Sequence, residues 1–522
     1  MSAPSAGDST VNLPNGAAML ILDPTSLTLP TLRQLWQGGE CRLDDASMAR
    51  IRASAAAVDR IVAGGETVYG VNTGFGLLAN TRIPAERLAE LQRNLILSHS
   101  CGLGEPLQRH VVRLMIVLKM LGLGRGYSGV RPLVLDALQA LLDADAMPVI
   151  PSQGSVGASG DLAPLAHLVS ALLGEGRIDL GGEVMPAGQA LERMGRKPLE
   201  LGPKEGLALI NGTQASTAIA LDALFLGQRV FWAAIAAGGL SVEALKGSVK
   251  PFDERLSAVR GQPGQISVAA ALRGLLDGSA IVASHPGCGR VQDPYSFRCQ
   301  PQVMGAALDL LTNAGRTLEI EAGAVTDNPI VFGKDDGGED IAISGGNFHA
   351  QPVAFAADII AMALCEVGSL SERRTSVLVD PKMSGLPAFL TDDGGVNSGL
   401  MIPQVTAAAL VSENKSLAFP VSVDSIPTSA GQEDHVSMAP IAARKAVTIA
   451  RNAAGIVAIE LIAASQGVDY HAPLATSPRL QQLHATVRSI SPHLETDRYW
   501  ADEMAALQSA VLAGEIGWAD GA

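Results

Sequence analysis

The chain has 522 residues, of which 47% are hydrophobic, 4% aromatic and 17% charged, and its formal net charge is −14. This acidic balance argues against nucleic acid or an anionic membrane as a partner. Five scattered cysteines without a CxxC pair argue against a disulfide framework or a zinc site. Alanine and leucine outnumber the β-branched residues, which favours a large, mostly helical globular protein.

The first two hundred residues predict short helices separated by loops. Thr28 and Asp44 stand where N-caps are expected, and Asp161 is expected to cap a helix as well. A Gly- and Asn-rich loop is expected over 67–81, and a short irregular or hairpin excursion over 174–203. The expected helices occupy parts of 25–63 and the ranges 86–98, 108–122, 131–144 and 162–173.

Longer Ala- and Leu-rich segments begin after residue 205. Their apolar residues recur at helical spacing on wide faces, which is typical of helices buried in a bundle. These segments cover 214–238, 301–322, 351–373, 405–416 and 439–465. We therefore predict a mainly α fold with a long-helix bundle core and a smaller N-terminal loop and helix lobe.

The domain organisation predicted from this pattern is simple. Residues 1–16 form a flexible tail, and 17–522 form a single domain with an N-terminal lobe over about 17–210 and a helical core over about 211–522. The start of the chain lacks the features of a secretory signal. The longest uncharged apolar run, 230–242, is shorter than the roughly 20 residues of a membrane span. A cytoplasmic protein is expected.

The most informative stretch is 154–161, which reads GSVGASGD between Pro151 and Pro164. Gly160 has no side chain, so its backbone nitrogen can approach the Ala158 carbonyl with little steric resistance. Closure of that ring and dehydration of Ser159 would create an electrophile, which no ordinary side chain provides. The run lacks the P-loop and GxSxG patterns. A plain tight turn remains the alternative.

Four other clusters carry rare polar residues. Residues 69–76 (YGVNTGFG) place Tyr69 in a glycine loop, as a possible general base or as a half-buried turn residue. Residues 211–214 (NGTQ) fit a helix cap. In 292–298 (QDPYSFR), Asp293 and Pro294 fit a helix start, and Gln292, Tyr295 and Arg298 share one face.

The guanidinium of Arg298 suits a carboxylate, although a surface ion pair is equally compatible with the pattern. Residues 432–435 (QEDH) fit a solvated turn or a carboxylate that grips a cationic or N–H-bearing ligand. His99 fits a satisfied core histidine or a cation near a helix end. No HExxH or similar spacing is present, so no metal is expected.

Taken together, the motifs resemble those of the aromatic amino-acid ammonia-lyases, and within that family those of the histidine ammonia-lyases. The resemblance runs from about Tyr69 to Leu461 and is specific because many motifs occur in one order. They are YGVNTGFG at 69–76, GSVGASGDLAP at 154–164, NGTQA at 211–215, QDPYSFR at 292–298, TDNP at 326–329, GGNFH at 345–349 and QEDHVSM at 432–438.

The resemblance implies that Ala158, Ser159 and Gly160 cyclise into 4-methylidene-imidazol-5-one (MIO), a protein-derived electrophile, with no metal or nucleotide. It further implies Tyr69 as the leading candidate base and Arg298 as the carboxylate ligand. Tyr295, Gln292 and Asn211 would position the amine and the MIO group, and Phe348 would line the pocket. The family fold implies a homotetramer whose active sites draw on three subunits.

His99 and Glu433 occupy the positions that contact the substrate ring in the family. A carboxylate suits an imidazole N–H but would be unpaired against a bare phenyl ring. The resemblance therefore implies deamination of L-histidine to trans-urocanate and ammonia, the first step of histidine degradation, with Glu433 either orienting the ring or sharing the proton transfer. Gly431 and Val421 depart from the family pattern beside Glu433.

Two alternatives stay open. One is a lyase or 2,3-aminomutase that acts on tyrosine or phenylalanine. The other is a catalytically silent helical oligomer that kept the fold.

Overall fold

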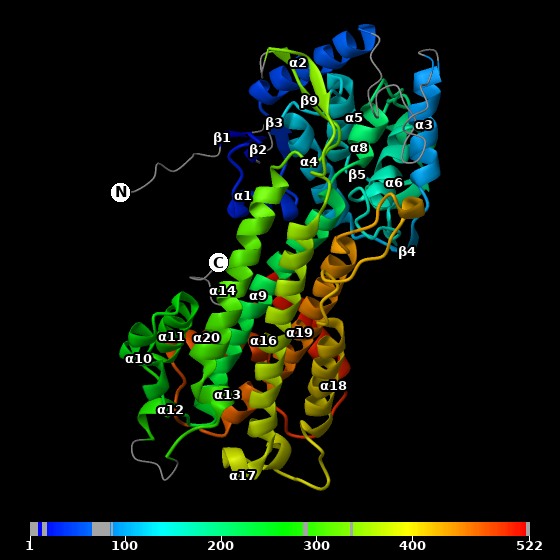
Figure 1. Cartoon of the computed structure of the whole chain (residues 1–522). Coiled ribbons are helices and arrows are strands. Elements are labelled where there is room, and N and C mark those ends of the chain that lie inside the picture. The colour runs from blue at the N-terminus through cyan, green and yellow to red at the C-terminus, as the bar shows by residue number, and fades with distance from the viewer. Residues whose placement is uncertain are drawn as a thin grey trace. The chain divides into compact units, whose positions relative to one another are not determined.

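The computed structural model of the chain describes residues 9–12, 18–64, 84, 87–285, 291–334 and 338–517 (Figure 1). The chain divides into two compact units. Unit 1 comprises Met1–Asp222, Gly315–Ala356 and Pro420–Ala443, and unit 2 comprises Ala223–Ala314, Ala357–Phe419 and Arg444–Ala522. Each unit is assembled from segments that are far apart in the sequence.

Unit 1 combines helices of moderate length with small sheets. Its helices are α1 (Leu29–Trp36), α2 (Asp45–Ala63), α3 (Leu88–His99), α4 (Arg109–Gly124), α5 (Pro132–Asp143), α6 (Leu162–Leu172), α7 (Ala187–Arg193) and α8 (Glu205–Ile210). The predicted N-caps of the first two are confirmed, because Thr28 accepts from the Thr31 amide and Asp44 from the Ser47 amide.

The sheets of unit 1 are short. β1 (Ser9–Asn12) pairs antiparallel with β2 (Ala18–Leu22), which pairs parallel with β3 (Cys41–Leu43). β5 (Ala146–Pro148), β7 (Arg177–Leu180) and β8 (Glu183–Pro186) form an antiparallel sheet. β9 (Ile330–Phe332) pairs with β10 (Ile341–Ile343). The β7–β8 hairpin confirms the irregular segment or hairpin that is expected within 174–203.

One small sheet positions the site. β4 (Leu103–Pro106) follows α3 and pairs antiparallel with β6 (Pro151–Gln153), which immediately precedes the glycine-rich run. The imidazole Nε2 of His167, on α6, also accepts a 2.9 Å hydrogen bond from the Gly102 amide. These contacts fix the end of α3, and therefore His99, relative to residues 154–161.

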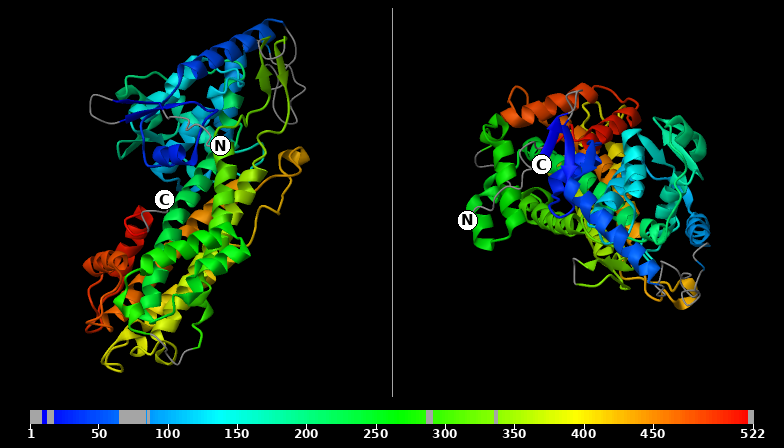
Figure 2. Two further views of the ribbon diagram at one scale, coloured as in Figure 1. Left: turned by 90° about the vertical axis from the view of Figure 1, so that its left-hand side faces the viewer. Right: turned by 90° about the horizontal axis from the view of Figure 1, so that it is seen from above.

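Unit 2 contains most of the residues of the four longest helices, which lie side by side in both views (Figures 1 and 2). They are α9 (Gln214–Ala244), α14 (Gln300–Ala322), α16 (Gln351–Val379) and α19 (Ala439–Asp469). The other helices are α10 (Glu254–Arg260), α11 (Pro263–Leu276), α12 (Ala280–Ala283), α13 (Tyr295–Arg298), α17 (Pro381–Ser384), α18 (Met401–Leu417), α20 (Pro478–Ile490) and α21 (Ala501–Ala513). The mainly α prediction is confirmed.

An ion pair is buried within this bundle. The guanidinium of Arg374 on α16 binds both carboxylate oxygens of Glu460 on α19, at 2.5 and 2.7 Å, and both side chains are fully buried. Ser241 and Ser371 donate to the same carboxylate. Because each charge is paired and further hydrogen-bonded, the bundle tolerates polar groups at its centre.

Three helices correct the expectation that no segment approaches the length of a membrane span. By length and composition alone, α9, α16 and α19 are long and apolar enough to cross a membrane. Each contains a few charged residues, so a search for uncharged runs does not find them. In each, between 67% and 83% of the apolar window is buried by the rest of the protein. Their apolar faces thus form part of the hydrophobic core.

The prediction of one domain over 17–522 stays a prediction.

Candidate active site

Within the Ala158–Ser159–Gly160 tripeptide, the last two residues have left-handed backbone conformations. Ser159 has φ of 51° and Gly160 has φ of 79°, values that a residue with a side chain rarely adopts. A Cβ atom on Gly160 would lie 2.4 Å from the Gly212 carbonyl oxygen. Glycine is therefore required at 160 both by conformation and by the close approach of a second segment.

That second segment is residues 211–212, which follow α8. The side-chain amide of Asn211 donates to the Ser159 carbonyl oxygen at 2.6 Å. The Asp161 amide donates to the Gly212 carbonyl at 2.8 Å, and Gly160 and Gly212 form a parallel bridge. These bonds hold the tripeptide on both sides of Gly160.

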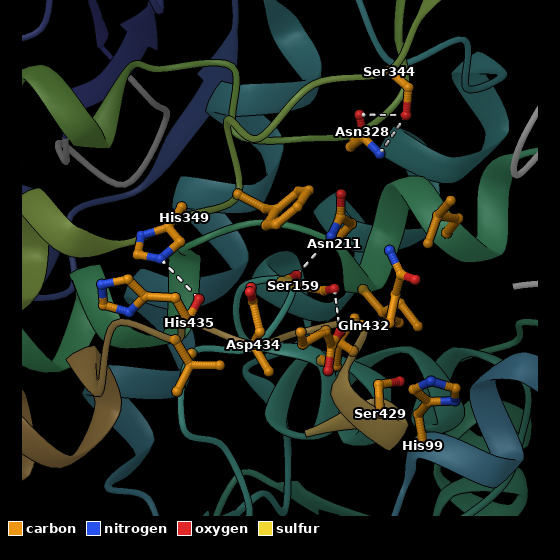
Figure 3. A pocket seen from close by; sticks show the side chains of 18 of the residues that line it. His99, Ser159, Asn211, Asn328, Ser344, His349, Ser429, Gln432, Asp434 and His435 are labelled. Atoms are coloured by element: carbon orange, nitrogen blue, oxygen red, sulfur yellow. Dashed lines mark hydrogen bonds between the residues drawn. The ribbon is translucent and has the colours of Figure 1, made fainter. Parts of the chain in front are cut away.

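A cavity of about 940 Å³ in unit 1 opens onto Ala158 and Ser159 (Figure 3). It contains six of the side chains predicted from the sequence, which come from five separate stretches of the chain: His99, Ala158, Ser159, Asn211, Phe348 and Glu433. The other lining residues are Leu95, Gly157, Leu162, Leu207, Ile210, Asn328, Ser344, Gly345, His349, Ser429, Ala430, Gln432, Asp434, His435 and Val436.

Glu433 lies at the centre of this arrangement. Its Oε1 accepts a 2.5 Å hydrogen bond from the Ser159 hydroxyl, and its Oε2 accepts one of 2.8 Å from the Thr428 hydroxyl. The Thr428 amide also donates to the Glu433 carbonyl at 2.9 Å. The carboxylate is thus held by its own loop and aimed at the tripeptide.

His99 is the last residue of α3 and lines the same cavity (Figure 3). Its Nδ1 lies 2.7 Å from the Leu95 carbonyl oxygen. Nδ1 also lies 3.0 Å from the Ser98 hydroxyl, but the carbonyl contact is shorter and a carbonyl only accepts, so we assign Nδ1 as the donor; Nε2 is then an acceptor when the ring is neutral. An acceptor nitrogen and a carboxylate therefore border one pocket.

Behind the tripeptide lies Asp161, which is fully buried. It occupies the N-cap position of α6, but the predicted capping role is wrong, because its Oδ2 accepts from the Ser216 amide and hydroxyl at 2.7 and 2.9 Å. Burial raises the pKa of Asp161 to about 6, and the hydrogen bonds from Ser216 oppose that rise. The carboxylate ties the tripeptide to the start of α9.

Tyr69, Gln292, Tyr295 and Arg298 are not among the described residues that line the cavity. Tyr69 is outside the described residues. Gln292, Tyr295 and Arg298 belong to unit 2 and do not line the cavity. The Arg298 guanidinium lies 4.6 Å from the centre of the Tyr295 ring, so this part of the expected face is present.

A second cap prediction needs correction. The N-cap of α13 is Pro294, not Asp293, whose Oδ2 instead accepts from the Ser248 amide at 2.7 Å. The short helix therefore starts without a side-chain cap.

Two histidines in the cavity were not proposed as site residues from the sequence. The rings of His349 and His435 are 5.8 Å apart and nearly perpendicular, and Nε2 of His349 is 3.2 Å from the His435 carbonyl oxygen (Figure 3). Both residues fall inside the GGNFH and QEDHVSM motifs, so the signal was present. The contact holds the Glu433 loop to the loop that carries Phe348.

Comparison with known proteins places this geometry in a family. The aromatic amino acid lyase family matches residues 27–489. Histidine ammonia-lyase of Paracidovorax citrulli is 58% identical over 94% of this chain and 95% of its own. The structure of histidine ammonia-lyase from Trypanosoma cruzi is 41% identical, with a TM-score of 0.88 over 95% of this chain and 94% of that chain.

The structure of tyrosine aminomutase from Streptomyces globisporus is also similar, with 34% identity and a TM-score of 0.89 over 95% of this chain and 97% of that chain. Members of the matched family use the MIO group. The family predicted from the motifs is thereby confirmed, and the chain belongs to the aromatic amino acid lyase family.

Proposed function

We propose that the protein is a histidine ammonia-lyase, a carbon–nitrogen lyase that converts L-histidine to trans-urocanate and ammonia. Curated relatives that are 57–58% identical over 94% of the chain carry that name. The observation that carries the proposal is that His99 and Glu433 line the same cavity as Ser159. One acceptor nitrogen and one carboxylate match the two N–H groups of a protonated imidazole ring.

The tripeptide fits the MIO group that the family uses. The left-handed backbone at Ser159 and Gly160 already turns the chain tightly, and Gly160 leaves no room for a Cβ. Closure joins the Gly160 nitrogen to the Ala158 carbonyl carbon, whose oxygen leaves as water. Ser159 loses its hydroxyl and its Cα proton as a second water. The resulting methylidene supplies an electron sink that ordinary side chains lack.

Asn211 would hold the group through the Ser159 carbonyl, and Phe348 would line the pocket beside it. Within the pocket, the acceptor Nε2 of His99 would receive one N–H of the substrate ring and the Glu433 carboxylate the other, an arrangement that pairs both nitrogens when the imidazole is protonated. This pairing orients the ring and excludes a phenyl ring, which would leave the carboxylate desolvated without a partner. The kinetic constants of Glu433→Gln distinguish orientation of the ring by Glu433 from transfer of the β-proton.

Tyr69 would take the β-proton, and Arg298, with Gln292 and Tyr295, would bind the substrate carboxylate and amine. Tyr295 is 71% exposed in the isolated chain. We propose that the enzyme is a cytoplasmic homotetramer and that these three residues reach the cavity of another copy. A mixture of two variants of lowered activity, one in Arg298 and one in Glu433, would then recover activity on coassembly.

An absorbance assay for urocanate, run with histidine, tyrosine and phenylalanine in parallel, tests the proposal. We expect urocanate from histidine together with an intact subunit mass lower by two water molecules. Product from tyrosine or phenylalanine alone would support the lyase or aminomutase alternative, to which the 34% identical tyrosine aminomutase gives weight. An unmodified mass would indicate the silent oligomer.

A further inference from the structure

Lys119 is a buried cation for which the proposed chemistry has no use. It lies on α4, is 2% exposed and is flanked by the apolar residues Leu118 and Met120. Its Nζ donates to two carbonyl oxygens, those of Asn211 at 3.0 Å and Ala208 at 3.3 Å. Burial of an ammonium group is costly, so these two bonds are the compensation that the position provides.

Both acceptors belong to the end of α8. The last carbonyls of a helix have no partner within the helix, and the helix dipole makes that end negative. α8 is only six residues long and ends at Ile210, and the Asn211 amide donates a 2.8 Å hydrogen bond back to the Leu207 carbonyl. Lys119 caps this end from a different helix and thereby fixes the main chain at Asn211.

The same stretch of main chain carries the contacts to the ring-forming tripeptide. The Asn211 side chain donates to the Ser159 carbonyl at 2.6 Å, and the next residue, Gly212, accepts from the Asp161 amide at 2.8 Å. A continuous chain of hydrogen bonds therefore runs from Lys119 through Asn211 to Ser159.

The charged groups around Lys119 are Asp327, Asp161 and Lys204. Lys204 is itself fully buried and pairs with Asp327 at 2.5 Å. Burial lowers the pKa of Lys119 to about 7, while Asp327 and Asp161 oppose that change. Two lysines thus share one buried cluster, but in the described part of the chain only Lys119 donates to the end of α8.

We propose that Lys119 is a positioning residue that holds Asn211 against the Ser159 carbonyl and thereby sets the rate at which Ala158, Ser159 and Gly160 form their ring. This inference rests on the proposed function. A donor on the Ser159 carbonyl oxygen withdraws electron density from the adjacent Cα and makes its proton more acidic. That proton leaves in the dehydration of Ser159. A displaced Asn211 would therefore slow ring formation without removing any atom of the ring.

The experiment measures ring formation directly. Wild-type protein and Lys119→Met are made by cell-free synthesis, translation is stopped, and the intact subunit mass is followed with time. Methionine keeps the length of the side chain and removes its charge and donors. We expect the species lacking two water molecules to appear about 10- to 100-fold more slowly in the variant, the range for loss of a charge-assisted hydrogen bond.

Lys204→Met is the matched control, because it removes a lysine of equal burial from the same cluster while leaving the Asn211 contact in place. It should lower the melting temperature, yet complete the ring at close to the wild-type rate. Lys119→Arg, which retains charge and donors, should form the ring faster than Lys119→Met. If Lys119 mattered only for its shape, the larger arginine would be the worse replacement.

The outcomes are distinguishable. Wild-type kinetics in Lys119→Met, or equal slowing in Lys204→Met, would overturn the role of Lys119. A wild-type subunit that never loses the two waters would overturn the proposed function instead. Where Lys119→Met is not recovered with native circular dichroism, Lys119→Gln, which keeps a shorter neutral donor, provides the same comparison with arginine.

Discussion

The Glu433 carboxylate accepts a 2.5 Å hydrogen bond from the Ser159 hydroxyl across a sequence separation of 274 residues. The residue proposed to recognise the substrate ring therefore touches the residue proposed to become the electrophile. The Thr428 hydroxyl donates to the second carboxylate oxygen, which fixes the orientation of the Glu433 carboxylate. The hydroxyl leaves when the ring forms, so this hydrogen bond belongs to the uncyclised chain and shows how close the carboxylate lies to the future electrophile.

Replacement of Glu433 by glutamine should reduce kcat/KM for histidine about 10- to 100-fold, because the charge-assisted hydrogen bond to the imidazole is lost. The subunit should still lack two waters. Steady-state urocanate assays across pH check both kinetic constants: a change in KM alone indicates orientation, and a change in kcat indicates proton transfer. Asp434→Asn is the neighbouring control and should have a smaller effect. Undiminished urocanate production by Glu433→Gln would refute the role of Glu433 in recognition of the imidazole ring.

Gly160→Ala should abolish ring formation. Its Cβ would lie 2.4 Å from the Gly212 carbonyl oxygen, and the backbone there has φ of 79°. Gly182→Ala is the control that distinguishes backbone strain from steric overlap. Gly182 also has a positive φ, of 97°, but no atom lies within 4 Å of an added Cβ. Intact mass should show the unmodified polypeptide for Gly160→Ala and the two-water loss for Gly182→Ala. A fully modified Gly160→Ala protein would contradict the close approach.

Asp161 should make the stability of the protein depend on pH. Its pKa rises from 3.8 to about 6 on folding, so the folded state binds the proton more tightly. The resulting stabilisation is complete below pH 3.8 and is lost as the pH rises through 6, a change of about 3 kcal/mol. Relative to wild type, Asp161→Asn should therefore be more favourable at pH 7 than at pH 4.

Urea unfolding of both proteins at the two pH values provides the measurement. A constant difference between wild type and Asp161→Asn across this range would mean that Asp161 does not titrate there. Comparison of each protein with itself removes any constant effect of the substitution on packing.

Arg374→Met should lower the free energy of unfolding by about 3–5 kcal/mol, because it leaves the buried Glu460 carboxylate without its partner. Both members of this pair are fully buried. The control is Arg193→Met, since Arg193 and Glu183 are 45% and 65% exposed, and such pairs contribute at most about 1 kcal/mol. Denaturant midpoints check both values. Equal effects at the two sites would refute the distinction based on burial.

Much of the fold and the family was predictable from local patterns. The long helices follow from apolar residues at helical spacing, and their boundaries extend only a few residues beyond those predicted. Thr28 and Asp44 were identified as caps because an N-cap depends on nearby residues alone. The motif order identified the family because it needs no knowledge of distances.

The predictions failed where the role of a side chain depends on a partner far away in the sequence. Asp161 and Asp293 look like caps, yet their carboxylates bind Ser216 and Ser248, which the local sequence does not reveal. Lys119 did leave a signal, as a lone lysine within the apolar stretch 114–123. Its acceptors, Ala208 and Asn211, are 89 and 92 residues away, so its role required coordinates.

Because His99 lies at the very end of α3, recognition of the substrate ring and formation of the MIO ring depend on different segments of the chain. The glycine-rich run is hydrogen-bonded to Asn211 and Gly212, neither of which belongs to α3. Replacement of the His99 side chain alone would leave those contacts in place, whereas a one-residue insertion in α3 would rotate its end by roughly 100° and disturb β4, which pairs with β6 beside the run. A library that varies only the side chain at position 99 therefore samples new aromatic substrates while the hydrogen bonds of the ring-forming loop to Asn211 and Gly212 stay in place.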